Sequence, residues 1–247
     1  MIERKWIKTW LGGSRENNGA SRAFSVMIPS NDLALDLENA RLAVMADFFC
    51  TWQTGKKPLI MFLNAPNIQN ENLARLGLFM CQDQGAKFDL GVIPRDFPVI
   101  AENIEGAKII NAGRLLPHTS LEYLLPDFGG DVLRLYFLYL GPPDRDYKFE
   151  WINLAGVYKF AQKVWHLGRG FTGSTPSVST QEELVGLEEV VNTRIEQKKP
   201  HTALAAIMEF LKDKKHLSQI EILMVAKLLK PYTPFLSAEL VSFISSV

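Results

Sequence analysis

The feature that most constrains the fold is a change of sequence pattern near residue 150. Between residues 24 and 150, short unbroken apolar runs alternate with stretches of helical periodicity. Strands buried on both faces of a parallel sheet have this uninterrupted apolar form. Between residues 151 and 247, amphipathic helical periodicity continues with almost no strand signal. The pattern predicts an N-terminal segment over 1–23, an α/β domain over 24–150 and a helical domain over 151–247.

The α/β domain is predicted to contain three strands and two helices. The strands are expected over 25–29, 58–63 and 88–93, and the helices over 35–52 and 70–84, with Gly55 and Gly85 where the helices stop. Strands that alternate with helices pair in parallel through right-handed crossovers. We therefore expect an incomplete Rossmann-like sheet, half of a doubly wound nucleotide-binding fold.

The helical domain is predicted to be an antiparallel bundle. Helices are expected over 151–167, 182–195, 202–211 and 220–229. Thr180 with Glu183, and Ser218 with Glu221, have the spacing of capping boxes. Thr233-Pro234 is typical of an N-cap followed by a proline in the first turn. Residues 168–180 are predicted to form a flexible connector, and short connections elsewhere favour antiparallel neighbours.

Charge and cysteine content limit the kinds of partner that we expect. Twenty-seven Lys and Arg residues balance 27 Asp and Glu residues, so any contact with nucleic acid is expected to be local. The candidates are Lys198, Lys199, Lys212, Lys214 and Lys215, with solvated helix ends as the other interpretation. No apolar run is long enough to cross a bilayer, and two cysteines cannot build a disulfide framework. We expect a cytoplasmic protein without membrane contact.

Common catalytic and metal-binding signatures are missing from the sequence. It has no G-x-G-x-x-G after a strand, no phosphate loop, no H-E-x-x-H and no G-x-S-x-G. The histidines lie outside metal-ligand spacings and are interpreted as surface or capping residues: His118, His166, His201 and His216. Cys50 falls on an apolar helix face and is interpreted as a core residue. We predict no metal site and assign no catalytic residue.

Several segments resemble leucyl-tRNA synthetases. Gly129-Gly130-Asp131-Val132-Leu133-Arg134-Leu135-Tyr136 is similar to the family's Tyr-Gly-Ala-Asp-x-x-Arg-Leu-Tyr, and Gly141-Pro142-Pro143, Asp146 and Trp151 follow as in the family. Segments 201–210 and 228–240 are similar to family motifs in the same order. The resemblance covers about residues 111 to 240. It implies a class I synthetase fold, with an incomplete HUP-type Rossmann domain and an anticodon-binding-type bundle.

The family's first signature, His-x-Gly-His, is replaced in this chain. Asp36 and Asn39 stand in place of the two histidines, Glu38 in place of the glycine, and Arg41 is kept. In the family these histidines stabilise the triphosphate, and catalysis of this kind requires preorganised donors or positive charge. We therefore expect negligible adenylation. The simpler interpretation is drift into a capped helix start, where acidic residues interact favourably with the helix dipole.

The family's second signature, Lys-Met-Ser-Lys-Ser, is also replaced. Asn111-Ala112-Gly113-Arg114 stands at the matching place, and Arg114 is the only cation left. ATP is thus a ligand that the resemblance alone implies. About 15 residues separate Ile93 from Lys108, where a full enzyme has its editing insertion and further strands. We also expect a truncated protein, because the family's C-terminal extension has no counterpart.

Three hypotheses remain open. The first is a leucyl-tRNA synthetase-like paralogue that does not ligate leucine to tRNA and binds tRNA or a protein partner. The second is a repurposed enzyme or sensor for an amino acid, nucleotide or aminoacyl conjugate. In it, Arg41 and Arg114 would hold an anionic group, and Asp36 or Glu38 an amino group. The third is an interaction module whose sheet edge is covered in a homodimer.

Overall fold

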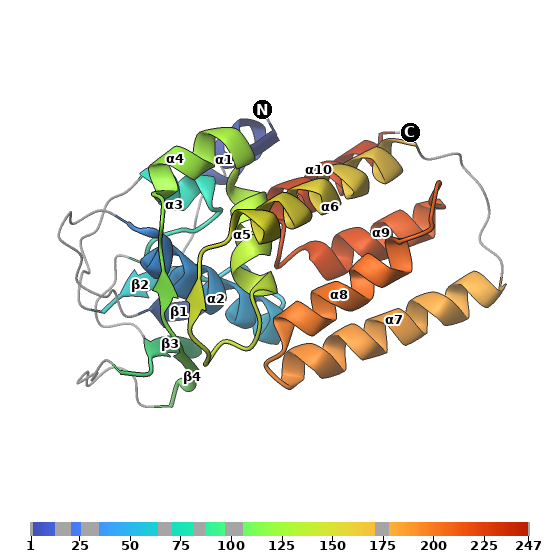
Figure 1. The fold of residues 1–247 in the computed structure, drawn as a ribbon. Coiled ribbons are helices and arrows are strands. Elements are labelled where there is room, and N and C mark those ends of the chain that lie inside the picture. The colour runs from blue at the N-terminus through green and yellow to red at the C-terminus, as the bar shows by residue number, and fades with distance from the viewer. Residues whose placement is uncertain are drawn as a thin grey trace.

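The computed structural model describes residues 2–12, 21–25, 35–63, 71–81, 87–96, 106–170 and 178–246. The strands are β1 (Arg22–Ser25), β2 (Leu59–Phe62), β3 (Leu90–Pro94), β4 (Lys108–Ala112), β5 (Leu115–Leu116) and β6 (Tyr147–Lys148). The helices are α1 (Ile2–Gly12), α2 (Leu37–Thr54), α3 (Glu71–Arg75), α4 (Leu121–Phe128), α5 (Gly130–Tyr139), α6 (Trp151–Arg169), α7 (Val178–Glu196), α8 (Pro200–Leu211), α9 (Gln219–Leu229) and α10 (Pro234–Ile244). Figure 1 shows the strands gathered in one half of the molecule and α6 to α10 in the other.

The first four strands form a parallel sheet in the order β2-β1-β3-β4. The chain passes from β1 to β2 on one side and returns to β3 on the other, so the strand order reverses beside β1. The parallel Rossmann-like unit, followed by an all-helical part, is thus confirmed. β1 begins before the predicted run over 25–29, and residues 26–29 of that run lie outside the described residues.

The two faces of the sheet belong to different apolar clusters. Ala23 and Ile60 point into the main core, whereas Phe24 and Met61, the next residue in each strand, join a small cluster on the opposite face. This alternation follows from the two-residue period of a strand. Gly91 in β3 makes room for the Phe24 ring, because an added Cβ would lie 1.9 Å from it.

Helix α2 lies between the sheet and α5. Every residue from Leu37 to Thr51 is buried, so the helix is enclosed on all sides rather than amphipathic. Gly55 ends the helix in the left-handed conformation (φ 69°), as predicted. Cys50 is a core residue, also as predicted, and burial raises the pKa of its thiol to about 12.

The predicted helix over 70–84 is wrong over residues 76–81, and residues 82–85, with the predicted stop at Gly85, lie outside the described residues. α3 ends at Arg75, and Gly77 takes up a left-handed conformation (φ 69°). Met80 then forms a parallel bridge with Ile60 of β2, as the Ile60 N–H donates to the Phe79 carbonyl at 2.7 Å. The backbone in this segment therefore satisfies its hydrogen bonds beside β2 instead of within a helix.

Strand β4 was not predicted. Lys108 and Asn111 are exposed whereas Ile110 and Ala112 are buried, so the strand lacks the unbroken apolar run of β2 and β3. β4 pairs with β3 alone among the described strands. A half-exposed strand beside a single neighbour gives a much weaker sequence signal than a central one.

The predicted bundle helices are confirmed with small shifts of their ends. The Ser218 capping box is present, because the Ser218 N–H and Oγ both donate to Glu221 at 2.7 Å. The capping box at Thr180 is wrong, because α7 already begins at Val178. The predicted connector over 168–180 is also too long, since α6 continues to Arg169. Residues 171–177 lie outside the described residues.

A fully buried arginine, Arg134 in α5, joins the two halves of the structure. Its Nη2 donates to Asp47 Oδ2 in α2 at 2.7 Å, and both side chains are 0 % exposed. Its guanidinium also donates to the backbone carbonyls of Leu76 at 3.1 Å, Tyr232 at 3.1 Å and Pro231 at 2.5 Å. Arg134 therefore fixes α2, the turn after α3 and the α9–α10 junction relative to one another.

The main apolar core also runs through both halves. It includes Leu42 of α2, Leu154 of α6 and Leu204 of α8 in one cluster of buried residues. The division of the chain into two domains at residue 150 therefore stays a prediction.

Asp131 in α5 caps the start of α10. Its carboxylate accepts the N–H of Leu236 at 2.6 Å and the N–H of Phe235 at 3.3 Å. The start at Thr233-Pro234 is confirmed, but the cap comes from another helix rather than from the Thr233 side chain. Burial raises the pKa of Asp131 to about 7, although the two capping hydrogen bonds lower it.

Arg134→Met should destabilise the protein strongly. The change leaves the buried Asp47 carboxylate with Lys57, 2.6 Å away, as its remaining cation, and it removes a guanidinium that also donates to three backbone carbonyls. We therefore expect a loss of about 3 kcal/mol, the low end for removal of one member of a buried pair. The free energy of unfolding in urea measures this cost. Arg169→Met is the matched control, because Arg169 is exposed and lies over the Trp165 ring, a contact worth about 0.5–1 kcal/mol. Equal losses in the two variants would contradict the role given to Arg134.

Asp131 should make stability fall as the pH rises. A carboxyl whose pKa is about 7 in the folded chain and 3.8 in the unfolded chain takes up a proton on folding between these pH values. Asp131→Asn keeps an oxygen acceptor and removes this titration. Relative to the wild type, the variant should gain roughly 1–2 kcal/mol between about pH 4 and pH 8, less than the full shift implies because Asp131 is partly exposed. Urea unfolding at several pH values measures the difference, and parallel curves would contradict it.

Candidate functional site

The two replaced signatures lie together beside the sheet. Residues 36–41 form the start of α2, and residues 111–114 end β4 and lead into β5. In open α/β folds, ligands bind outside the carboxyl ends of the strands where the strand order reverses. This is the region that the sequence marked as the remnant of a nucleotide site.

Glu38 and Arg114 form a bidentate ion pair across this region. Arg114 Nε donates to Glu38 Oε1 at 2.5 Å, and Arg114 Nη2 donates to Oε2 at 3.1 Å. The N–H of Leu115 also donates to Oε1, at 3.2 Å. The Glu38 side chain is 9 % exposed and that of Arg114 is 41 % exposed. The hydrogen bond to Glu38 raises the pKa of Arg114, so this cation is neutralised within the chain.

Arg41, the retained cation of the first signature, is used internally as well. It is 1 % exposed, and it donates to the carbonyls of Gly113 at 2.8 Å and Pro143 at 3.2 Å. Its guanidinium lies 5.3 Å from the centre of the Tyr147 ring. Burial lowers the pKa of Arg41 to about 10. Arg41 therefore holds two loops together.

Asp36 and Asn39 serve the start of α2. Asp36 is its N-cap, and its Oδ1 accepts the N–H of Asn39 at 2.8 Å. Burial raises the pKa of Asp36, while its hydrogen bonds to Asn39 lower it. The interpretation as a capped helix start is confirmed for Asp36. Asn39 is fully buried, so its side chain faces the interior.

Sequence reasoning missed that the loop over 141–146 supports the second signature. The Arg114 N–H donates to Asp146 Oδ1 at 2.8 Å, and the Gly113 N–H donates to the Pro143 carbonyl at 2.9 Å. An added Cβ on Gly113 would lie 2.3 Å from the Arg145 backbone, so only glycine fits. Pro143 and Asp146 belong to the motif that carries the family resemblance. That motif was the signal in the sequence that could have pointed to this loop.

The described residues do not fit the phosphates of ATP. Both cations of the region are engaged, one by a carboxylate and the other by backbone carbonyls. An anionic ligand would therefore have to displace Glu38 and lie close to its charge. Among the described residues, no group of three or more His, Cys, Asp or Glu could hold a metal ion.

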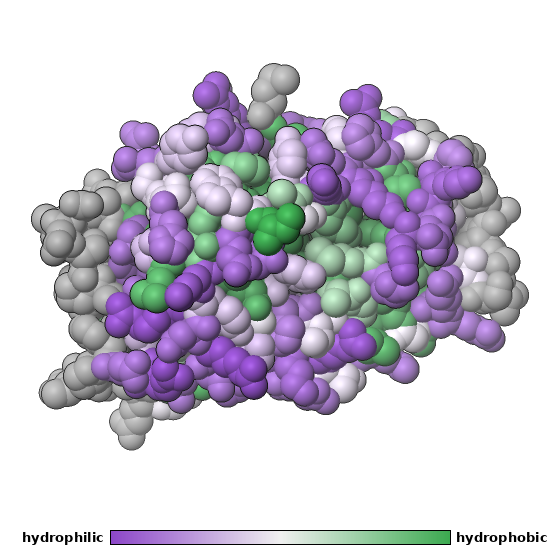
Figure 2. All heavy atoms as spheres, in the orientation of Figure 1, coloured by the Kyte–Doolittle hydropathy of each residue, from purple (hydrophilic) through white to green (hydrophobic). Residues whose placement is uncertain are grey.

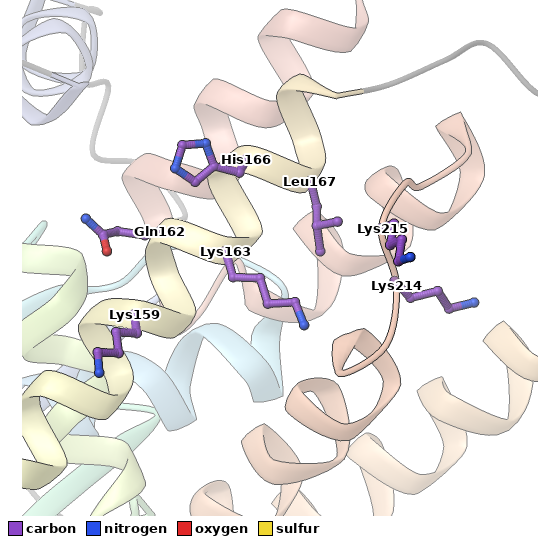
Figure 3. Close-up of a pocket in the computed structure, with 7 residues that line it drawn as sticks. All are labelled: Lys159, Gln162, Lys163, His166, Leu167, Lys214 and Lys215. Atoms are coloured by element: carbon purple, nitrogen blue, oxygen red, sulfur yellow. The ribbon is translucent and has the colours of Figure 1, made fainter.

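A basic groove lies elsewhere, between α6 and the α8–α9 turn. Its volume is ≈ 590 Å³, and it is lined by Lys159, Gln162, Lys163, His166, Leu167, Lys214 and Lys215. In Figure 3, Lys163 and Leu167 point from α6 toward the turn, whereas Gln162 and His166 point away from it. No acidic residue lines the groove. Within the described chain, no carboxylate pairs with Lys159 or Lys215, and both are exposed.

The predicted lysine contacts do not form one patch. Lys198 and Lys199 precede α8, whereas Lys212, Lys214 and Lys215 follow it, so roughly 18 Å of helix separates the two groups. Lys214 is paired with Glu221 at 2.9 Å and Glu183 at 3.3 Å, and its ammonium lies over the Phe210 ring. Of the five, Lys214 and Lys215 line the groove, where Lys159 and Lys163 of α6 join them.

In sequence the chain resembles class I aminoacyl-tRNA synthetases, and it has a Rossmann-like parallel sheet followed by helices. More narrowly, it resembles leucine–tRNA ligases. It is 28 % identical over 180 residues to the enzyme of Pelodictyon phaeoclathratiforme, covering 62 % of this chain and 21 % of that one. It is 24 % identical over 193 residues to that of Lawsonia intracellularis, covering 63 % and 23 %. The chain thus spans about a fifth of the length of these relatives.

Solved structures match the chain at lower sequence identity and with TM-scores below 0.5. A ternary complex of Agrobacterium radiobacter K84 LeuRS with tRNA and LeuAMS matches at 16 % identity and TM-score 0.45, covering 56 % of this chain and 22 % of that one. Apo methionyl-tRNA synthetase of Mycobacterium tuberculosis matches at 16 % and TM-score 0.44, covering 62 % and 43 %. No protein-family model matches the chain. No described helix is long and apolar enough to cross a membrane.

The Glu38–Arg114 pair should show a measurable coupling. Glu38→Gln, Arg114→Gln and the double variant form a cycle whose coupling free energy we expect to be about 1 kcal/mol, since Arg114 is partly exposed. The same cycle on the exposed pair Glu209–Lys212, which is 3.4 Å apart, should give about 0.2–0.5 kcal/mol. Urea unfolding measures both cycles, and a coupling no larger at Glu38–Arg114 would contradict the account.

Proposed function

We propose that this chain is a leucyl-tRNA synthetase-like paralogue that does not ligate leucine to tRNA and that binds tRNA through its helical half. The observation that carries the proposal is the bidentate pair between Glu38 and Arg114. The pair supports a structural role for Glu38 and Arg114, which stand at positions where the resemblance implies ATP-binding groups. The leucine–tRNA ligases supply only the family resemblance, because the chain covers about a fifth of them.

The loss of ligation follows from charge. Activation of an amino acid by ATP requires donors or cations placed where charge develops, and loss of one such donor costs about 10²–10³-fold in rate. In this chain a carboxylate, Glu38, replaces one expected group and neutralises Arg114, while Arg41 donates to carbonyls. The second hypothesis, a pocket for an amino acid or aminoacyl conjugate, relies on the same two cations and is not favoured.

The RNA contact is assigned to the basic groove between α6 and the α8–α9 turn. Lys159, Lys163 and Lys215 line a concave surface without a carboxylate among its described lining residues, and the Lys163 ammonium donates to the Lys212 carbonyl. Phosphate contacts of this kind supply most non-specific affinity for nucleic acid. They also suit a chain of zero net charge, in which attraction has to be local. An anticodon-binding-type role for the bundle, a cytoplasmic location and a homodimer remain further predictions.

Lys159→Ala with Lys215→Ala should weaken tRNA binding. We expect the affinity for tRNA to fall about tenfold at low salt. The slope of log affinity against log salt concentration should also become shallower, by the amount expected for the loss of about one to two phosphate contacts. Filter retention of a labelled tRNA pool at several KCl concentrations measures both quantities. Lys56→Ala with Lys87→Ala is the control, because these exposed lysines belong to the α/β half and the change in net charge is equal.

Two outcomes would overturn this proposal. One is the absence of tRNA retention by the wild-type chain above a neutral control protein at low salt. The other is an equal loss in the two double variants, because the attraction would then come from overall charge rather than from the groove.

A further inference from the structure

A second groove lies on the other side of the α8–α9 turn, between α7 and α8. Its volume is ≈ 690 Å³. Its apolar lining residues are Gly186, Leu187 and Val190 of α7 and Ala205, Ala206 and Phe210 of α8. Val190 is 41 % exposed. This α7–α8 groove plays no part in the proposed RNA contact.

The lining residues of α7 follow a single helical stripe. Glu183, Gly186, Leu187, Val190 and Arg194 are spaced by three and four residues, so they share one face of α7. The stripe comprises 12 residues from Glu183 to Arg194, whose ends lie about 16 Å apart along a helix. A groove of this length between two neighbouring helices matches about three turns of a third helix packed against both.

Gly186 gives the groove a notch. An added Cβ on Gly186 would meet nothing within 4 Å, so the absence of a side chain there is not required by packing inside the protein. Glycine in a helix interior costs about 0.5–1 kcal/mol relative to alanine. Small residues at Gly186, Ala205 and Ala206 instead leave space for a large side chain from outside.

Carboxylates outnumber cations by one among the residues that line the groove. The lining carboxylates are Glu183, Glu209 and Asp213, and the lining cations are Arg194 and Lys214. Lys214 pairs with Glu183 and Glu221 and so offsets the charge of Glu183, whereas Arg194 donates to the neutral Thr202 carbonyl at 2.6 Å and keeps its positive charge. Glu209 has only an exposed contact with Lys212 at 3.4 Å, and no ion pair is formed by Asp213 in the described chain.

We propose that the α7–α8 groove is a docking site for a basic amphipathic helix of another protein. The apolar stripe of such a helix fills the notch at Gly186 and packs on Val190 and Phe210. Its Lys or Arg side chains meet Glu209 and Asp213. Recognition of an amphipathic helix in an apolar groove uses anchors at this spacing, with charge at the rim setting the partner. Glu209 and Asp213 would repel the phosphates of RNA, and this groove shares only Lys214 with the lining of the basic groove.

The test uses a fluorescein-labelled peptide of about 14 Leu and Lys residues with leucines at positions i, i+3, i+4 and i+7. Fluorescence anisotropy measures its binding to the full chain. We expect the peptide to bind at least about tenfold more tightly than a scrambled peptide of the same composition, because only the first has an apolar stripe. Equal binding of the two peptides, or none of the striped one, would overturn the proposal.

Gly186→Trp should fill the notch and weaken peptide binding by about tenfold. Gly156→Trp is the matched control, since Gly156 also lies within a helix, in α6, and also has nothing within 4 Å of an added Cβ. That control should bind the peptide within about twofold of the wild type. Binding retained by Gly186→Trp, or lost equally in both variants, would contradict docking in this groove.

Two further variants complete the test. Val190→Lys changes an exposed position and should repel a basic helix, which keeps the proposal testable if Gly186→Trp folds poorly. Glu209→Lys with Asp213→Lys should weaken peptide binding by about fivefold or more. Neither Gly186→Trp nor Val190→Lys should change tRNA retention. Loss of tRNA binding in both would show that the two grooves are one site, contrary to the proposal.

Discussion

The buried pair between Arg134 and Asp47 is the interaction on which the rest of the structure depends. Replacement of such a pair by apolar residues is often neutral, so its value lies in specificity rather than in net stability. Arg134 has its hydrogen bonds satisfied only when α2, the turn after α3 and the α9–α10 junction are all in place. A different packing of the helical half on the sheet would leave a charge buried without a partner.

Arg134 belongs to the motif that carries the family resemblance, and the other members of that motif also have contacts within the chain. Asp131, Arg134 and Tyr136 belong to the resembling motif, and each has a structural partner. Asp131 caps α10, Arg134 pairs with Asp47, and the Tyr136 hydroxyl accepts the N–H of Glu150 at 3.0 Å. None of these contacts requires ATP. The start of α2 and the end of β4 instead contact each other through Glu38 and Arg114, which supports the proposal that a catalytic scaffold is used for binding.

Local signals made α2, the Ser218 capping box and the parallel order of the strands predictable from sequence. The features that the sequence did not predict share one physical cause: each depends on contacts with residues far away in the sequence. The stretch after Arg75 has a helical pattern of apolar residues, but its backbone bonds to β2. β4 forms beside β3 although its own residues are half exposed. Glu38 and Arg114 are 76 residues apart, so each was identified without the pairing that defines its role. The two grooves lie between helices and could be located only after packing was known.

The central claim is that this chain has the scaffold of a leucine-activating enzyme without its nucleotide chemistry. Leucine-dependent exchange of labelled pyrophosphate into ATP tests that claim most directly, with a leucine–tRNA ligase as the positive control. The account predicts that the chain gives no exchange above the buffer blank at any leucine concentration, because Glu38 and Arg114 neutralise each other. Exchange that rises with leucine and is abolished by a leucyl-adenylate analogue would contradict it.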